Sequence, residues 1–291
     1  MRNLDFIVSF LMVFVFCTTH AQTTDEKLGK ANNYLFENNY SAALELYKEL
    51  LNEVTDSVDL SHIYSYAGMC SESLGDQDAA LDYYRNAVNY KVLEESVYNK
   101  VLSLARDKKD TDCQEFVLLK KMEVFPAAKE KALEDLARVY MASKQYAKLS
   151  PLAERLISID QSNYRYHYTF GIASQGLSKT DEAIAGFKKA LALNPDDLGS
   201  NLSLGFLLYN QATVQFDKEQ KRYEAVSKPV WKDYLVYLDR IKKIQAVYRE
   251  AEPLLEKACQ IKCNDQLEKA LSVIRSRTRQ IEPAEGLKAN E

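Results

Sequence analysis

The hydrophobic positions of this chain follow a helical period and form a pattern that repeats. Between residues 164 and 195, a small residue, an alanine, an aromatic residue and a second alanine are separated by twelve, four and three positions: Gly171, Ala183, Phe187 and Ala190. Steps of three and four place side chains on one face of a helix. The segment therefore predicts two helices, with a turn at Lys179-Thr180 and an end at Pro195.

The same ladder of small and large residues recurs at three other places with its spacing unchanged. Its members are Ala31, Ala43, Tyr47 and Leu50; Gly68, Ala80, Tyr84 and Ala87; and Ala137, Leu149, Ala153 and Leu156. Second-helix markers from Ala43 to Ala251 lie 37, 69, 34 and 68 residues apart, all close to multiples of 34. The gap of 69 predicts a unit that has lost its markers, and we interpret residues 92–126 as this degenerate third repeat.

Close packing of two antiparallel helices explains the ladder. A small first-helix residue such as Gly171 lets the second helix approach, and the aromatic residue of the second helix fills the adjoining gap. This unit resembles the tetratricopeptide repeat (TPR) family, whose order of small residue, Ala, aromatic, Ala and Pro is seen in SQGLSKTDEAIAGFKKALALNP. The resemblance implies an all-α solenoid of antiparallel helix pairs, with five repeats in residues 22–195 and about six in all.

The last third departs from this spacing. Residues 196–264 begin as a sixth repeat at Gly205, but the second-helix markers Ala251, Leu255 and Ala258 start 46 residues later instead of twelve. We predict a helical hairpin insert at about residues 210–245, formed by two elongated helices, with Pro229 in the first turn of the second. A capping helix at residues 265–281 and a flexible tail at 282–291 follow. An elongated final repeat resembles exported TPR proteins of Bacteroidetes-type bacteria.

The first 21 residues predict a cleavable secretory signal peptide. Eleven almost wholly apolar residues, 6–16, follow Arg2 and precede small residues at Thr19 and Ala21. The run is too short to span a bilayer, and no later segment is apolar enough, so no transmembrane span is expected. Lipidation at Cys17 is the alternative. We expect an exported protein, most simply periplasmic, with outer-membrane association or secretion left open.

The cysteines and a short surface motif leave two questions open. The mature chain would keep Cys70 and Cys113, interpreted as small buried residues, and Cys259 and Cys263, one helical turn apart. Free thiols are favoured over a disulfide between the last two. The sequence Asp56-Ser57-Val58 resembles a short O-glycan acceptor, although a turn is the simpler interpretation.

Composition and motif content argue against several classes of function. A net charge of −4 removes the electrostatic basis for a nucleic-acid binder. Only His62 and His167 remain after signal removal, and neither has partners at metal-ligand spacing, so we expect no metal, no cofactor and no catalysis. We interpret His167 as a packed histidine, because the repeat pattern places a large residue there.

The TPR resemblance also places a concave surface, lined by first-helix residues. In the two units nearest the insert these candidate protein-binding residues are Tyr168, Ile172, Gln175, Leu202, Phe206 and Tyr209. Trp231, Tyr234 and Tyr237 form a second candidate surface on the insert, although packing against the preceding helix is favoured for them. We expect a scaffold of the bacterial envelope that binds a protein or peptide. A self-associating structural protein, for example a homodimer, and a small-molecule or glycan binder are the alternatives.

Overall fold

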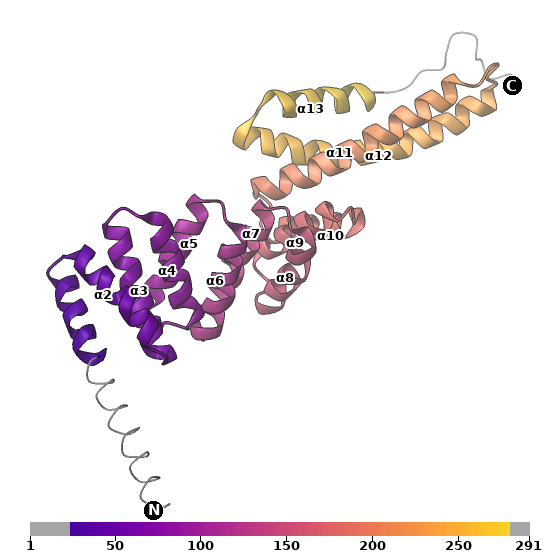
Figure 1. The fold of residues 1–291 in the computed structure, drawn as a ribbon. Coiled ribbons are helices and arrows are strands. Elements are labelled where there is room, and N and C mark those ends of the chain that lie inside the picture. The colour runs from indigo at the N-terminus through magenta and orange to yellow at the C-terminus, as the bar shows by residue number, and fades with distance from the viewer. Residues whose placement is uncertain (1–23, 280–291) are drawn as a thin grey trace, which may run out of the picture. The chain divides into compact units, whose positions relative to one another are not determined.

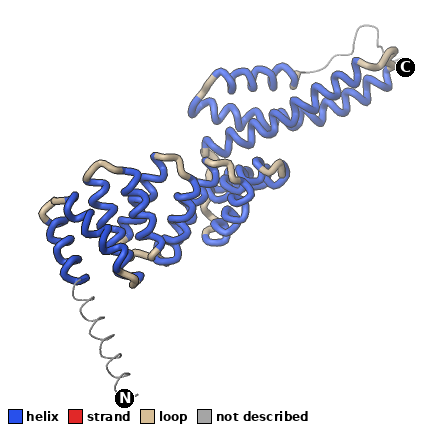
Figure 2. The backbone as a smooth tube through the Cα atoms, viewed as in Figure 1, coloured by secondary structure: helices blue, strands red, loops and turns tan. Residues whose placement is uncertain are grey.

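The computed structural model describes residues 24–279, and all regular elements among these residues are helices (Figures 1 and 2). They form two compact units that divide between Val139 and Tyr140, inside one helix. The first unit contains a helix at residues 24–36, α2 (Tyr40–Glu53), α3 (Ser57–Ser73), α4 (Gln77–Asn89), α5 (Glu95–Asp107), α6 (Thr111–Val124), a 3₁₀ turn (Pro126–Ala128) and most of α7 (Lys129–Ala142). The second contains α8 (Tyr146–Ile159), α9 (Tyr164–Gly176), α10 (Thr180–Leu193), α11 (Leu198–Glu224), α12 (Trp231–Lys262) and α13 (Asp265–Arg277).

Each of the first five helix pairs turns through one residue in the left-handed backbone region. These residues are Asn38, Gly75, Lys109, Lys144 and Ser178, and each lies two positions after the end of the first helix of its pair. They recur every 34 to 37 residues, which is the period of the ladder. The helices α5 and α6, joined at Lys109, are therefore a full repeat although their sequence lacks the ladder.

Contacts between paired helices match the predicted ladder. A Cβ atom added at Gly68 would lie 2.6 Å from the Tyr84 ring, and one at Gly171 would lie 2.5 Å from the Phe187 ring. Both rings are buried. Only glycine therefore allows these aromatic rings to occupy their positions, as the spacing predicts.

The sixth pair consists of two much longer helices, of 27 and 32 residues. A Cβ atom at Gly205 would lie 2.5 Å from the Leu255 side chain, so the predicted pairing across 46 residues is present. The insert continues α11 and begins α12, and the two helices pack together along an extended hairpin (Figure 1). The prediction for Pro229 is wrong by two residues: α12 begins at Trp231 because the carboxylate of Asp233 accepts a hydrogen bond from the Val230 N–H (3.0 Å) and fixes the cap there.

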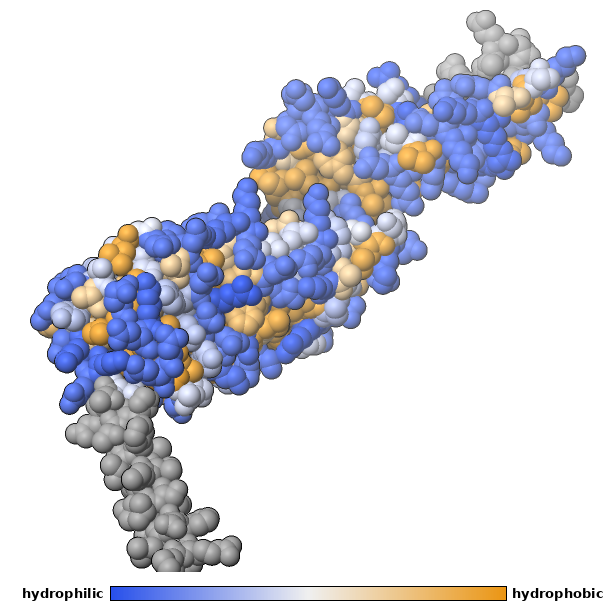
Figure 3. Space-filling model, in the orientation of Figure 1, coloured by the Kyte–Doolittle hydropathy of each residue, from blue (hydrophilic) through white to orange (hydrophobic). Residues whose placement is uncertain are grey.

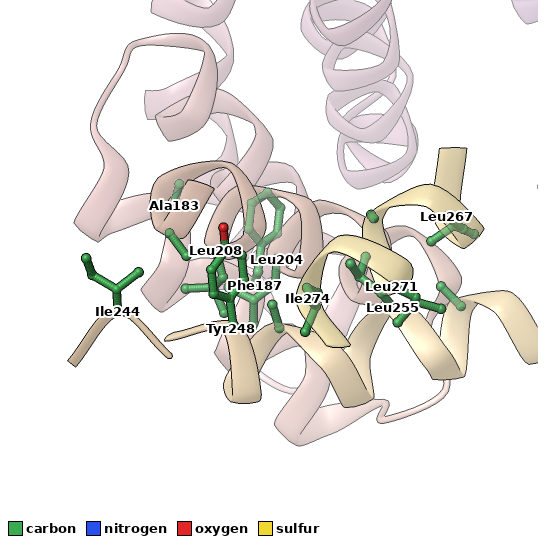
Figure 4. Close-up of a cluster of buried hydrophobic side chains, with 14 of the residues drawn as sticks. Ala183, Phe187, Leu204, Leu208, Ile244, Tyr248, Leu255, Leu267, Leu271 and Ile274 are labelled. Carbon is green, nitrogen blue, oxygen red and sulfur yellow. The ribbon is translucent and has the colours of Figure 1, made fainter. Parts of the chain in front are cut away.

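Helix α13 packs on α12 through four buried apolar residues: Leu267, Ala270, Leu271 and Ile274. They join the largest apolar core of the second unit, which draws side chains from α10, α11, α12 and α13 (Figure 4). Arg277 ties the end of α13 to α11 by donating to the Asp217 carboxylate (2.7 Å), and its guanidinium lies over the Phe216 ring at 4.6 Å. The predicted signal peptide and the whole of the predicted tail lie outside the described residues.

Candidate protein-binding surface

The candidate groove residues lie on two helices of the second unit. Tyr168, Ile172 and Gln175 come from α9, and Leu202, Phe206 and Tyr209 come from α11. The five large side chains are each partly buried against the apolar core, while Gln175 is exposed. These five side chains therefore combine core packing with an accessible apolar edge.

Tyr168 links the two helices. Its ring lies 5.9 Å from the Phe187 ring, and a Cβ atom at Gly199 of α11 would be 3.1 Å from it. Its hydroxyl is hydrogen-bonded to the Ser203 side chain, and burial raises the pKa of the phenol. Tyr168 therefore stays neutral at physiological pH and fixes the spacing of α9 and α11.

Phe206 and Tyr209 form an aromatic pair on α11. Their ring centroids lie 6.4 Å apart in an edge-to-face arrangement, and Tyr209 lies 6.2 Å from the buried ring of Tyr248. The Tyr248 hydroxyl donates to Thr213 (3.0 Å) and accepts from Arg277 (2.9 Å). The Tyr248 ring beneath Tyr209 is therefore held by hydrogen bonds to α11 and α13, which limits its freedom to move.

The histidine next to this surface is used in packing. His167 is buried, and its Nε2 lies 2.9 Å from the Gln161 carbonyl oxygen, so it is the packed residue that the repeat pattern predicts. Within residues 24–279, no three His, Cys, Asp or Glu side chains gather as a metal site would require. Half-buried aromatic and aliphatic edges on neighbouring helices are suited to contact with apolar side chains of another chain.

The insert aromatics are mostly used in packing between α11 and α12. Tyr234 is only 4% exposed and cannot present its ring to a partner. Tyr237 stacks on Tyr223 of the preceding helix with centroids 4.5 Å apart, and burial raises the pKa of both phenols. Trp231 is partly exposed and lies 5.2 Å from the Tyr234 ring. Of the three, Trp231 is thus the least committed to the interior.

One pair of cysteines differs from the expectation of free thiols. Cys259 and Cys263 form a disulfide across the last turn of α12, with Cα atoms 4.0 Å apart, so the expectation of free thiols is wrong for them. Cys263 is the C-cap residue of α12, with an extended backbone, and the two Cα atoms lie closer than the roughly 6 Å expected for residues four apart within a helix. Cys70 and Cys113 are free and buried, as predicted.

Sequence reasoning missed a groove beside this disulfide, between α12 and α13. It has a volume of about 870 Å³ and is lined by Cys259, Leu271, Arg275 and neighbouring polar residues. Arg275 is already paired with Glu252 (3.3 Å) and Glu256 (2.7 Å), so its charge is not available to an anion. No sequence motif marks this groove, because it arises only from the docking of α13.

Comparison with known proteins identifies the fold. No family model matches the chain, and a search of curated proteins finds no significant match. Among solved structures, a "putative protein binding protein" from Bacteroides ovatus ATCC 8483 is similar at 19% identity and TM-score 0.52, covering 75% of this chain and 97% of its own.

Two further solved structures are less similar. One is a tetratricopeptide repeat protein from Parabacteroides merdae ATCC 43184 (16% identity, TM-score 0.39, 87% of this chain and 99% of its own). The other is YrrB, a TPR protein with an unusual peptide-binding site (14% identity, TM-score 0.44, 79% and 97%). The repeated helix pairs, their period and the likeness to the Bacteroides ovatus protein show that this chain has the fold of an all-α TPR solenoid.

Proposed function

We propose that this chain is a non-catalytic scaffold of the bacterial cell envelope that binds a protein or peptide through the α9–α11 surface. The observation that carries the proposal is the set of five half-buried apolar side chains on two adjacent first helices. Tyr168, one of the five, packs closely against α11, and the buried ring of Tyr248 lies beneath Tyr209. Rigid aromatic edges of this kind contribute most of the binding energy in protein interfaces. The TPR fold supports a scaffold role, and the predicted signal peptide supports the envelope.

The test is site-specific photo-cross-linking in the native cell. Gln175 is the position for a benzoylphenylalanine substitution, because its side chain is exposed and lies outside the core. We expect a discrete cross-linked species, which mass spectrometry then identifies. Phe206→Ala combined with Tyr209→Ala should reduce its yield, since both rings supply accessible apolar surface.

The matched control replaces two partly exposed apolar residues on second helices, Ile159→Ala in α8 and Leu193→Ala in α10. These variants also remove exposed apolar side chains, but away from α9 and α11, so the cross-link should remain. Equal yields from both double variants, with the fold intact by circular dichroism, would exclude the α9–α11 surface. A cross-link only to a second copy of the chain would favour the self-associating alternative.

A further inference from the structure

The tip of the α11–α12 hairpin, defined as residues 221–236, exposes an unusual number of apolar side chains. Four aliphatic side chains of the tip are between 37% and 58% exposed: Val226, Val230, Leu235 and Val236. Figure 3 shows hydrophobic residues interspersed among hydrophilic ones at this end of the hairpin. Trp231, the sole tryptophan of the chain, lies among them and is partly exposed. The core of the second unit does not require these side chains to be apolar.

The tip is also locally basic in a chain that is acidic overall. Residues 221–233 carry four basic and two acidic side chains, a net charge of +2, whereas the whole chain carries −4. The two carboxylates face different partners: Asp233 caps the Val230 N–H, and Glu224 accepts from the Gln220 amide (2.9 Å). Arg222 has only a long contact with Glu219 (3.8 Å). In the described part of the chain, Lys221, Lys228 and Lys232 have no ion-pair partner.

We propose that this tip binds an anionic membrane surface. Lysine side chains attract anionic lipid headgroups, and valine, leucine and tryptophan side chains partition into the interface beneath them. A protein partner would need acidic groups placed against individual lysines, whereas a lipid surface accepts lysines at irregular positions such as a loop, a helix end and a first turn.

The dimensions of the tip fit a shallow insertion. From Trp231 to Val236 is five residues, or roughly 7.5 Å along the helix. Interfacial segments bury their apolar side chains about 5–10 Å into the headgroup region. The loop at Lys228 is the end of the hairpin and enters first, so the insertion stops within the headgroup region, where water can hydrate its backbone groups and the lysine chain can reach the lipid phosphates. Among the described helices, none combines the length and the apolar character that crossing a membrane requires.

The experiment uses Trp231 as an internal probe in the full mature chain. Its fluorescence is recorded during titration with vesicles of equal parts phosphatidylcholine and phosphatidylglycerol, and with vesicles of phosphatidylcholine alone. We expect a blue shift, quenching by brominated lipid and a loss of both at high salt, with the anionic vesicles only. No change in Trp231 emission with anionic vesicles would overturn the proposal, even if the protein cosedimented with them.

Charge-reversal variants locate the binding to the tip. Lys228→Glu with Lys232→Glu should weaken vesicle binding by at least about tenfold. Lys189→Glu with Lys262→Glu changes the net charge equally at two exposed positions away from the tip and should bind as the wild type does. Equal loss in both variants would show a general charge effect and refute the tip assignment. Abolition of a protein cross-link by the tip variant, with vesicle binding unchanged, would instead assign the tip to a protein partner.

Discussion

The close approach of α9 to α10 can be tested by adding one methyl group, Gly171→Ala. The new Cβ would lie 2.5 Å from Cε1 of Phe187, a ring with no exposed surface into which to move. The two helices are in close contact at this point, because a Cβ at Gly186 would also lie 2.9 Å from the Gly171 backbone nitrogen. Overpacking of this kind costs about 1–3 kcal/mol, and the better helix propensity of alanine returns up to about 1 kcal/mol.

We therefore expect Gly171→Ala to lower the free energy of unfolding by about 1–2 kcal/mol, measured by urea denaturation with circular dichroism. Phe187→Leu removes Cε1, the atom nearest to the new methyl group, and replaces the rigid ring by a shorter side chain that can rotate away from it. In that background Gly171→Ala should cost at least about 1 kcal/mol less, which a double-mutant cycle measures directly. Gly29→Ala is the control, because nothing lies within 4 Å of its Cβ and it should stabilise its helix by about 0.5–1 kcal/mol.

A Gly171→Ala protein as stable as the wild type would refute this account of the ladder. The same conclusion would follow if Phe187→Leu left the cost of the substitution unchanged, since the cost would then come from somewhere other than the ring. Either result would mean that the small residue of the repeat is not required for the approach of the second helix.

Three further outcomes are expected. Burial raises the pKa of the Cys70 thiol to about 11 and that of Cys113 in the same direction, so native alkylation by iodoacetamide should be slow at neutral pH and accelerate as the pH rises. Cys259→Ser with Cys263→Ser should destabilise the protein by about 2 kcal/mol, and dithiothreitol should lower the Tm of the wild type but not of this variant. Arg277→Ala should lower the free energy of unfolding by about 1–3 kcal/mol and increase hydrogen exchange in α13. Exchange at the wild-type rate would show that the apolar contacts of α13 are enough to hold it against α12.

The sequence predicts the repeat architecture well, because the ladder records direct contacts between neighbouring helices. Gly171 and Phe187 are 16 residues apart in the sequence and are in contact. Gly205 and Leu255 are also in contact, although the insert separates them in the sequence. The third repeat lacks these markers. Its turn contains Lys109 at a φ of 56°, a left-handed conformation that a lysine in the sequence does not predict. Its length and helical composition indicate a helix pair, and the backbone contains one, α5 and α6.

The candidate surfaces are harder to predict, since exposure depends on the rotation of one long helix against another. The spacing of Trp231, Tyr234 and Tyr237 is compatible with either face, and the position of Tyr223 in α11 determines that Tyr237 turns inward. The disulfide is a similar case. Spacing alone permits a bond between Cys259 and Cys263 without requiring it, because thiols one turn apart also pack well when free.

The two proposed binding surfaces are linked by one continuous helix. Phe206 lies in the first half of α11, and the tip begins at Lys221, shortly before this helix ends at Glu224. Fifteen residues separate Phe206 from Lys221, which corresponds to roughly 22 Å of helix. If both proposals hold, the hairpin is a spacer that keeps a bound protein at a set height above the membrane surface. Because the two sites share no side chain, Lys228→Glu with Lys232→Glu should release the membrane while leaving the partner bound, and Phe206→Ala with Tyr209→Ala should do the reverse.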